Sequence, residues 1–113
     1  MQLEQLIQIR SDERAKSAYV EHGKFALSWA THDHFSICLR KEMQPTFDTG
    51  RVLALLWTHQ LHSLEEWNHI QIATNRNGCI CFLCRMQEKV ESTQDQLIRT
   101  IKTIEYSLSM ADL

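Results

Sequence analysis

The residues best suited to chemistry are histidines and cysteines, of which the chain has six and four. Some stand at spacings typical of metal sites: His59-x-x-His62, His32-x-His34 and Cys79-x-Cys81-x-x-Cys84. Zinc binds thiolate and imidazole ligands in a tetrahedron. Cys81 and Cys84, however, fall within one strand-like run, and the two-residue period of a strand sends them to opposite faces. We therefore favour core cysteines and interface histidines over a metal site.

Catalysis finds no better support in the sequence. A reactive cysteine needs a partly exposed, electropositive setting, whereas these cysteines lie among Ile, Phe and Leu. The sequence has no Gly-x-Ser-x-Gly elbow and no phosphate-binding P-loop, and it has only three glycines. The carboxylate pair Glu65-Glu66 is expected at a solvated helix end. We predict that the chain is not an enzyme and that it uses no cofactor.

Length and composition predict a single globular domain over residues 1–113. The net charge of −2 offers no basic footprint for nucleic acid. No apolar run is long enough to span a bilayer. The first residues lack the basic and apolar regions of a signal peptide. We therefore expect a cytoplasmic protein with no nucleic-acid partner and no membrane span.

The elements that would position these residues include a β-hairpin over residues 69–87. Asn77-Gly78 favours a type I′ turn, because Asn and Gly tolerate the positive φ that both central positions need. The second strand of this hairpin is apolar on both faces. That pattern predicts either a central strand covered on both sides or pairing across an oligomer interface.

The N-terminal part is predicted to form one helix and a second hairpin. Residues 2–22 have the pattern of a helix, either continuous or in two pieces, that ends at Gly23. Alternating apolar residues then predict strands over 24–30 and 35–42.

The middle helix, residues 46–66, has no charged residue between Val52 and Leu64. A helical wheel gives it a broad apolar, core-facing side: Val52, Leu53, Leu56, Trp57 and Leu64, extended by Ala54 and Leu61. The remaining side is also uncharged: Leu55, Thr58, His59 and His62. A helix without a charged side is buried all round, and the sheet of a small domain covers only one side. We predict that the second set forms a dimer interface; the alternative is cover by another helix of the same chain.

The C-terminal helix is predicted from Thr93 to about Ala111, after a capping box that begins at Ser92. Its apolar residues form the narrow stripe of a helix laid on a core: Leu97, Ile101, Ile104 and Leu108. The resulting order, α-β-β-α-β-β-α, predicts an α+β fold with an antiparallel sheet and helices packed on it.

Three segments resemble the type III secretion chaperones, small cytosolic proteins that bind secreted effectors or the secretion gatekeeper. They are Phe47-Asp-Thr-Gly-Arg-Val-Leu-Ala-Leu-Leu-Trp57, the two-strand segment Ile70–Met86 and the C-terminal helix Ser92–Met110. The resemblance implies dimers formed largely through the middle helix and the adjacent sheet, as homodimers or as heterodimers with a second chaperone. It also implies a partner chain wrapped around the chaperone in extended form. One departure is expected, because the family commonly has one more strand before the middle helix and Met43–Thr49 leaves no room for it.

Protein binding is therefore the leading hypothesis: a cytosolic type III secretion chaperone that binds and stabilises a secreted effector or gatekeeper protein before export. The expected partner-binding residues are apolar: Leu3, Leu6 and Ile7 of the first helix, with Phe25 and Leu27 of the first strand. An unpaired sheet edge would accept an extended segment of the partner as an added strand. The alternative is a small α+β regulatory or ligand-sensing module, with or without a His/Cys metal site. A structural subunit of a larger assembly is the third hypothesis.

Overall fold

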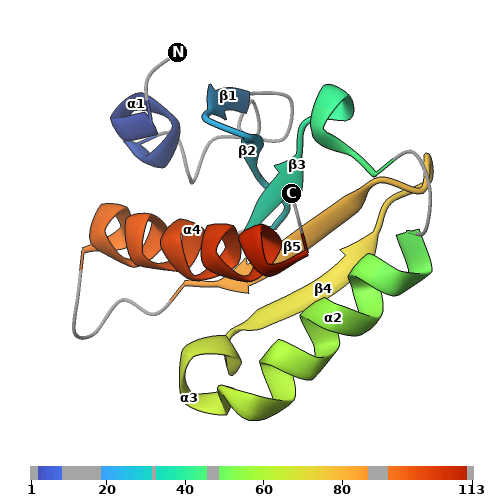
Figure 1. The fold of residues 1–113 in the computed structure, drawn as a ribbon. Helices are drawn as coiled ribbons and strands as arrows, with labels where there is room; N and C mark the ends of the chain where they lie inside the picture. Colours follow the sequence, from blue (N-terminus) through green and yellow to red (C-terminus); the bar gives the residue numbers. More distant parts are fainter. Residues whose placement is uncertain (1–2, 9–18, 32, 46–48, 87–91, 112–113) are drawn as a thin grey trace.

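The computed structural model describes residues 3–8, 19–31, 33–45, 49–86 and 92–111, which form a five-stranded antiparallel sheet with helices packed against it (Figure 1). In chain order the elements are α1 (Leu3–Gln8), β1 (Tyr19–His22), β2 (Phe25–Trp29), β3 (His34–Leu39), a 3-10 turn (Lys41–Met43), α2 (Thr49–His62), α3 (Leu64–Trp67), β4 (Ile70–Thr74), β5 (Ile80–Arg85) and α4 (Thr93–Met110). The strand order is β1-β2-β3-β5-β4, so β1 and β4 are the edges of the sheet. The predicted α+β class is confirmed.

The sheet has one strand more than the sequence predicted. Of the helix predicted over 2–22, α1 is the only helical part among the described residues, and 9–18 lie outside them. The chain then forms β1, which pairs with β2. Gly23 does not end a helix but takes a φ of +60° in the two-residue turn between these strands, a conformation that glycine adopts without a steric cost. The predicted number of strands before the middle helix was therefore wrong, although the additional strand lies at Tyr19–His22 and not in the Met43–Thr49 connection, of which 46–48 lie outside the described residues.

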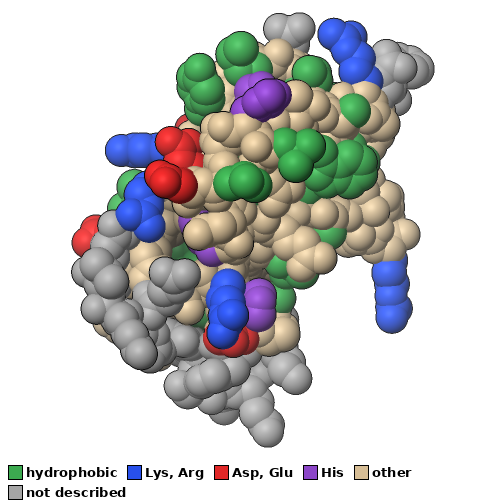
Figure 2. Space-filling view, turned by 90° about the horizontal axis from the view of Figure 1, so that it is seen from below, with side chains coloured by type: hydrophobic (Ala, Val, Ile, Leu, Met, Phe, Trp, Pro, Cys, Tyr) green, Lys and Arg blue, Asp and Glu red, His purple; other side chains and the backbone are tan. Residues whose placement is uncertain are grey.

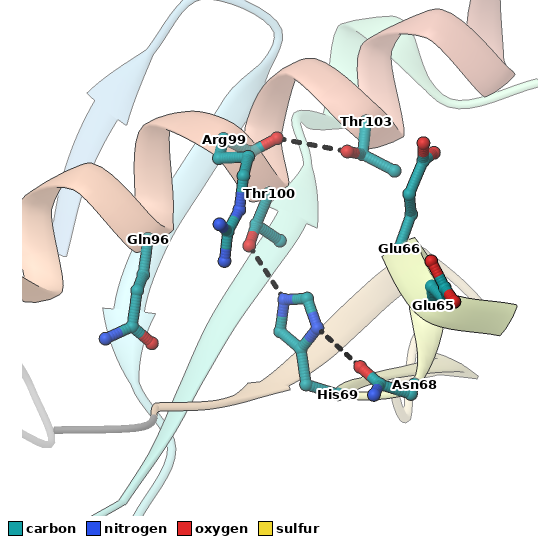
Figure 3. Close-up of a pocket in the computed structure, with 8 residues that line it drawn as sticks. All are labelled: Glu65, Glu66, Asn68, His69, Gln96, Arg99, Thr100 and Thr103. Carbon is teal, nitrogen blue, oxygen red and sulfur yellow. Dashed lines mark hydrogen bonds between the residues drawn. The ribbon is translucent and has the colours of Figure 1, made fainter. Parts of the chain in front are cut away.

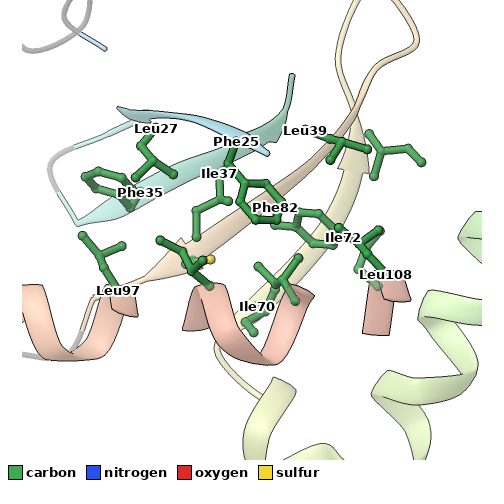
Figure 4. Packing of buried hydrophobic residues seen from close by; sticks show 14 of the residues in the cluster. Phe25, Leu27, Phe35, Ile37, Leu39, Ile70, Ile72, Phe82, Leu97 and Leu108 are labelled. Atoms are coloured by element: carbon green, nitrogen blue, oxygen red, sulfur yellow. The ribbon is translucent and has the colours of Figure 1, made fainter. Parts of the chain in front are cut away.

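The core fills the space between α4 and one face of the sheet (Figure 4). Alternate side chains of β2 and β3 point into it: Phe25, Leu27, Trp29, Phe35, Ile37 and Leu39. α4 contributes the predicted apolar stripe, in which all four side chains are buried. Ser92 caps this helix as predicted, because its side chain accepts a hydrogen bond from the backbone N–H of Asp95 at 3.1 Å.

The opposite face of the sheet stays accessible. Along β2, β3 and β5, buried residues alternate with half-buried ones, which is the pattern of a sheet covered on one side. Small or neutral side chains occupy these half-buried positions, which we call the open sheet face: Ala26, Ser28, Ser36, Cys38, Ala73, Cys81 and Leu83. The sequence offered two explanations for the two apolar faces of β5, and one was that this chain itself covers both. Such cover is not seen among the described residues.

The β4–β5 turn differs from the predicted type I′ turn. The backbone N–H of Gly78 donates to the carbonyl of Asn75 at 2.9 Å, so that Arg76 and Asn77 are the central residues. Gly78 follows them with a φ of +77°, as in a three-residue hairpin loop. The Asn75 side chain stabilises the loop by accepting the backbone N–H groups of Asn77 and Cys79 at 2.9 and 3.0 Å. The hydrogen bonds accepted by the Asn75 side chain therefore favour the three-residue loop over the two-residue loop that Asn77-Gly78 predicted.

The strand β1 can be tested by two substitutions with opposite expectations for a strand and a helix. Val20 is 9% exposed and faces the core, whereas Tyr19 beside it is 61% exposed. Val20→Ala is expected to lower the free energy of unfolding by about 1.5–2.5 kcal/mol, because two buried carbons are lost. Tyr19→Ala is expected to change it by less than about 0.5 kcal/mol. Urea denaturation measures both, and a larger loss for Tyr19→Ala would contradict the strand.

Candidate functional site

The outward side of α2 and α3 is the most prominent apolar surface. α2 lies beside β4 and α4 (Figure 1), and only Val52 and Leu56 of this helix are fully buried. Trp57 and Leu61, one helical turn apart, are 49% and 72% exposed, and Leu64 at the start of α3 is 60% exposed. We call these three residues the apolar patch. Figure 2 views this side, where hydrophobic side chains gather near the centre and charged ones lie mainly toward the margins.

The predicted dimer-interface residues, which lie on one side of α2, differ in exposure. Thr58 and His62 are exposed, whereas Leu55 and His59 are half-buried. His59 points toward α4, where its Nδ1 lies 3.1 Å from the hydroxyl of Ser107. Conversely, the apolar patch consists of residues that the helical wheel had assigned to the core. The reason is that α2 packs at the junction of β4 and α4, so that only a narrow strip of the helix is covered.

Three of the predicted partner-binding residues are core residues. Leu6, Phe25 and Leu27 have no exposed surface, so a partner has no access to them on the folded chain. Leu6 also accepts, at its backbone carbonyl, the indole N–H of Trp29 at 2.9 Å. Leu3 and Ile7 are partly buried against the core. Most of the apolar surface of α1 is therefore buried against its own domain.

A polar groove of about 310 Å³ lies between α3, the start of β4 and α4 (Figure 3). Its lining residues are Glu65, Glu66, Asn68, His69, Gln96, Arg99, Thr100 and Thr103. A second cavity of about 350 Å³ shares Glu66 and Thr103 with it and extends along α4 to His59 and Ser107. The groove thus follows one side of α4 for several turns.

His69 is fixed at the centre of this groove. Its Nε2 lies 3.0 Å from the hydroxyl of Thr100, and its Nδ1 lies 3.3 Å from the side-chain oxygen of Asn68. Because the amide oxygen can only accept, Nδ1 carries the hydrogen and Nε2 accepts from Thr100. Burial lowers the pKa of His69, and the nearby charge of Arg99 lowers it further.

His69 and Thr100 have the residue types of a catalytic pair, but a substrate has no access to the Thr100 hydroxyl. The Thr100 side chain is 1% exposed, so its hydroxyl offers no place for a substrate. Ser107, bonded to His59 in the same manner, is 3% exposed. Both pairs therefore serve to attach the layer of α2, α3 and β4 to α4.

Sequence reasoning missed this groove, although the sequence holds a signal for it. Beside the apolar stripe of α4 runs a second stripe with the same spacing, shifted by one residue: Gln96, Thr100, Thr103 and Ser107. Three of these four polar side chains are buried. Buried polar side chains need hydrogen-bond partners, so a polar stripe next to a core stripe predicts partners on the neighbouring elements.

Among the described residues, the cysteines and the remaining histidines do not form a metal site. As the two-residue period predicted, Cys81 lies on the open sheet face and Cys84 in the core. Burial raises the pKa of Cys84 to about 12, which suppresses its thiolate. His32 lies outside the described residues. Among the described residues there is no group of three or more His, Cys, Asp or Glu positioned to hold a metal ion.

Comparison with known protein families, with curated proteins and with solved structures found no match to this chain. In the described part of the chain, no helix is both long enough and apolar enough to cross a membrane.

The groove predicts the titration of one histidine. By NMR, the His69 imidazole is expected to titrate below 6.5, its ordinary pKa. Arg99→Gln should raise this pKa because it removes a neighbouring positive charge. Lys102→Gln, at the adjacent cavity, is the control and should leave it unchanged. A wild-type pKa at or above 6.5 would contradict the burial of His69 in the groove.

The same shift has a consequence for stability. The unfolded chain takes up this proton at a higher pH than the folded chain, so the free energy of unfolding should fall as the pH drops below about 6.5. Above that pH the group is neutral in both states and contributes no pH dependence.

Proposed function

We propose that this protein is a cytosolic type III secretion chaperone that binds and stabilises a secreted effector or gatekeeper protein before export. The observation that carries the proposal is the apolar patch, formed by Trp57, Leu61 and Leu64 on an uncharged stretch of α2 and α3. Large exposed aromatic and aliphatic side chains grouped on one surface are typical of protein-binding sites. A five-stranded antiparallel sheet with helices on one face also agrees with the family that the sequence resembles.

Under this proposal the apolar patch binds a second chaperone subunit. In a two-fold symmetric dimer the same surface is used by both copies, so Leu61 and Trp57 of one protomer meet the equivalent residues of its partner. A heterodimer would use the same patch against a related subunit. The absence of charged residues from Val52 to Leu64 favours burial of this side rather than lasting contact with water.

The substrate would bind elsewhere, as a strand added to the edge of the sheet. Among the described strands, β1 and β4 are the edges. A helix lies beside each edge, α1 at β1 and α2 at β4. At β4, the side chain of Gln60 already donates to the carbonyl of Ile70 at 2.9 Å. At β1, the alternation of the ladder directs the backbone groups of Tyr19 and Glu21 away from β2. We therefore assign the extended partner segment to β1.

The second candidate function is a small regulatory or ligand-sensing module. The groove around His69 favours it, because a concave site with several convergent polar groups suits a small polar ligand. Stoichiometric zinc in the purified protein would favour the metal-binding form of this alternative.

Self-association through the apolar patch is testable by gel filtration with light scattering. The wild-type chain is expected to give twice its mass of 13.3 kDa at micromolar concentration. Leu61→Asp should weaken the dimer at least about 100-fold, because the interface would bury an unpaired carboxylate. Gln71→Asp places the same charge at an exposed position of β4, on the other face of the sheet, and should leave the dimer intact.

Heterodimers and substrate binding need a second measurement. The chain is co-expressed with each secretion-system protein encoded beside it, and the complexes are purified and weighed by light scattering. A second chaperone subunit should be lost with Leu61→Asp but kept with Gln71→Asp. A wild-type chain that stays at 13.3 kDa and retains none of these proteins would refute the proposed function.

A further inference from the structure

The open sheet face brings two cysteines from different strands into register. We infer that Cys38 and Cys81 form a site for a reversible cross-strand disulfide, with a small-molecule disulfide such as oxidised glutathione as the co-reactant. Cys38 of β3 is the direct partner of Cys81 of β5, and both side chains are half-buried on the same face. The inference does not depend on the proposed function.

The backbone hydrogen bonds of the sheet determine whether Cys38 and Cys81 form a hydrogen-bonded or a non-hydrogen-bonded pair of the ladder. Arg40 donates its backbone N–H to Lys24 at 2.8 Å, and the two-residue alternation of the ladder then directs the backbone of Cys38 toward β2. Asn75 donates its backbone N–H to Cys79 at 3.0 Å, and the same alternation directs the backbone of Cys81 toward β4.

Cys38 and Cys81 are therefore a non-hydrogen-bonded pair of an antiparallel ladder. In such pairs the Cα atoms are about 4.5 Å apart and the side chains approach most closely. Disulfides span Cα separations of roughly 4.4–6.8 Å. The two strands thus place the Cα atoms at a separation that a disulfide can span, and closure needs rotation of the Cys38 side chain, whose thiol lies 3.6 Å from the carbonyl oxygen of Leu39.

The other two cysteines are placed less well for a bond. Cys84 is fully buried on the core side of β5. Cys79 shares the open face but lies two residues from Cys81 along the chain, diagonally across from Cys38. Diagonal neighbours on adjacent strands are about 7–8 Å apart, which exceeds the usual disulfide span. The geometry therefore selects one pair among the four cysteines.

The reaction is a double thiol–disulfide exchange. One protein thiolate attacks a sulfur of oxidised glutathione, which forms a mixed disulfide and releases one glutathione. The facing thiolate then attacks the protein sulfur of that mixed disulfide and releases the second glutathione. Two protein thiols are oxidised, one glutathione disulfide is reduced, and the two protons end on the released glutathione thiols.

The surroundings of the thiols make this exchange slow near neutral pH. Burial raises the pKa of Cys38 to about 11, with smaller contributions from Cys81 and Cys79. The pKa of Cys81 is also raised, mainly by burial. Since the thiolate is the attacking species, the rate should rise about tenfold per pH unit below these pKa values.

The experiment treats the full chain with oxidised glutathione at pH 7.5 and pH 8.5 and maps the cysteines by mass spectrometry. The expected product has lost two hydrogens and carries a Cys38–Cys81 linked peptide, formed about tenfold faster at the higher pH. Its melting temperature should rise by roughly 5–15 °C, because the link closes the loop that contains α2, α3 and β4. Dithiothreitol should reverse both changes.

Single serine substitutions separate the outcomes. Cys38→Ser and Cys81→Ser should each abolish the intrachain link, whereas Cys79→Ser, on the same face, is the control and should keep it. The inference requires that the wild-type chain forms the Cys38–Cys81 link and that Cys79→Ser retains it. A stable glutathione adduct without the link, a link to Cys79, a link between two chains, or no reaction of the folded protein at pH 8.5 would each overturn the inference.

Discussion

The packing of α4 on one face of the sheet is the constraint on which the rest of the structure depends. β2, β3, β4 and β5 send alternate side chains to this face, and β1 adds Val20. The stripe of α4 that runs from Leu97 to Leu108 packs against this face. One amphipathic helix cannot cover the other face as well. Two consequences follow: the open sheet face remains accessible, and α2 is left with a place at the side of the sheet, where only a narrow strip of it is buried.

Local patterns predicted the parts of the fold that this packing determines. Strands β2 and β3 and helix α4 alternate or repeat with a clear period, because one side of each meets the core. β5 was predicted instead from its apolar run after the Asn77-Gly78 turn signal. β1 was missed because it is a four-residue edge strand with a single buried side chain, Val20, which leaves no alternation to detect. The phase of α2 was wrong for a different reason. From Val52 to its end at His62 the helix has no charged residue, so the period alone does not say which side is covered, and tertiary contacts with β4 and α4 decide it.

The cysteines and histidines show the same distinction between what a local pattern predicts and what tertiary contacts decide. The spacing of Cys81 and Cys84 sufficed to place them on opposite faces, since that conclusion needs only a strand. The roles of His59 and His69 could not be predicted in this way, because each depends on a hydroxyl of α4 that is distant in sequence. The polar stripe of α4 is the feature that links them. It shows that histidines at metal-like spacing can serve as hydrogen-bond partners for buried hydroxyl groups.

The contacts that attach α2 to the domain connect the stability of this helix with the proposed function. Its own buried side chains are few, and two of its attachments are side-chain hydrogen bonds, from Gln60 to Ile70 and between His59 and Ser107. Hydrogen bonds of this kind contribute about 0.5–1.5 kcal/mol each. Burial of Trp57 and Leu61 against a partner would contribute about 1.5–3 kcal/mol per side chain, which exceeds each of these bonds. A partner bound at the apolar patch would therefore stabilise α2 in addition to the contacts that it makes within the domain, such as the buried Val52 and Leu56.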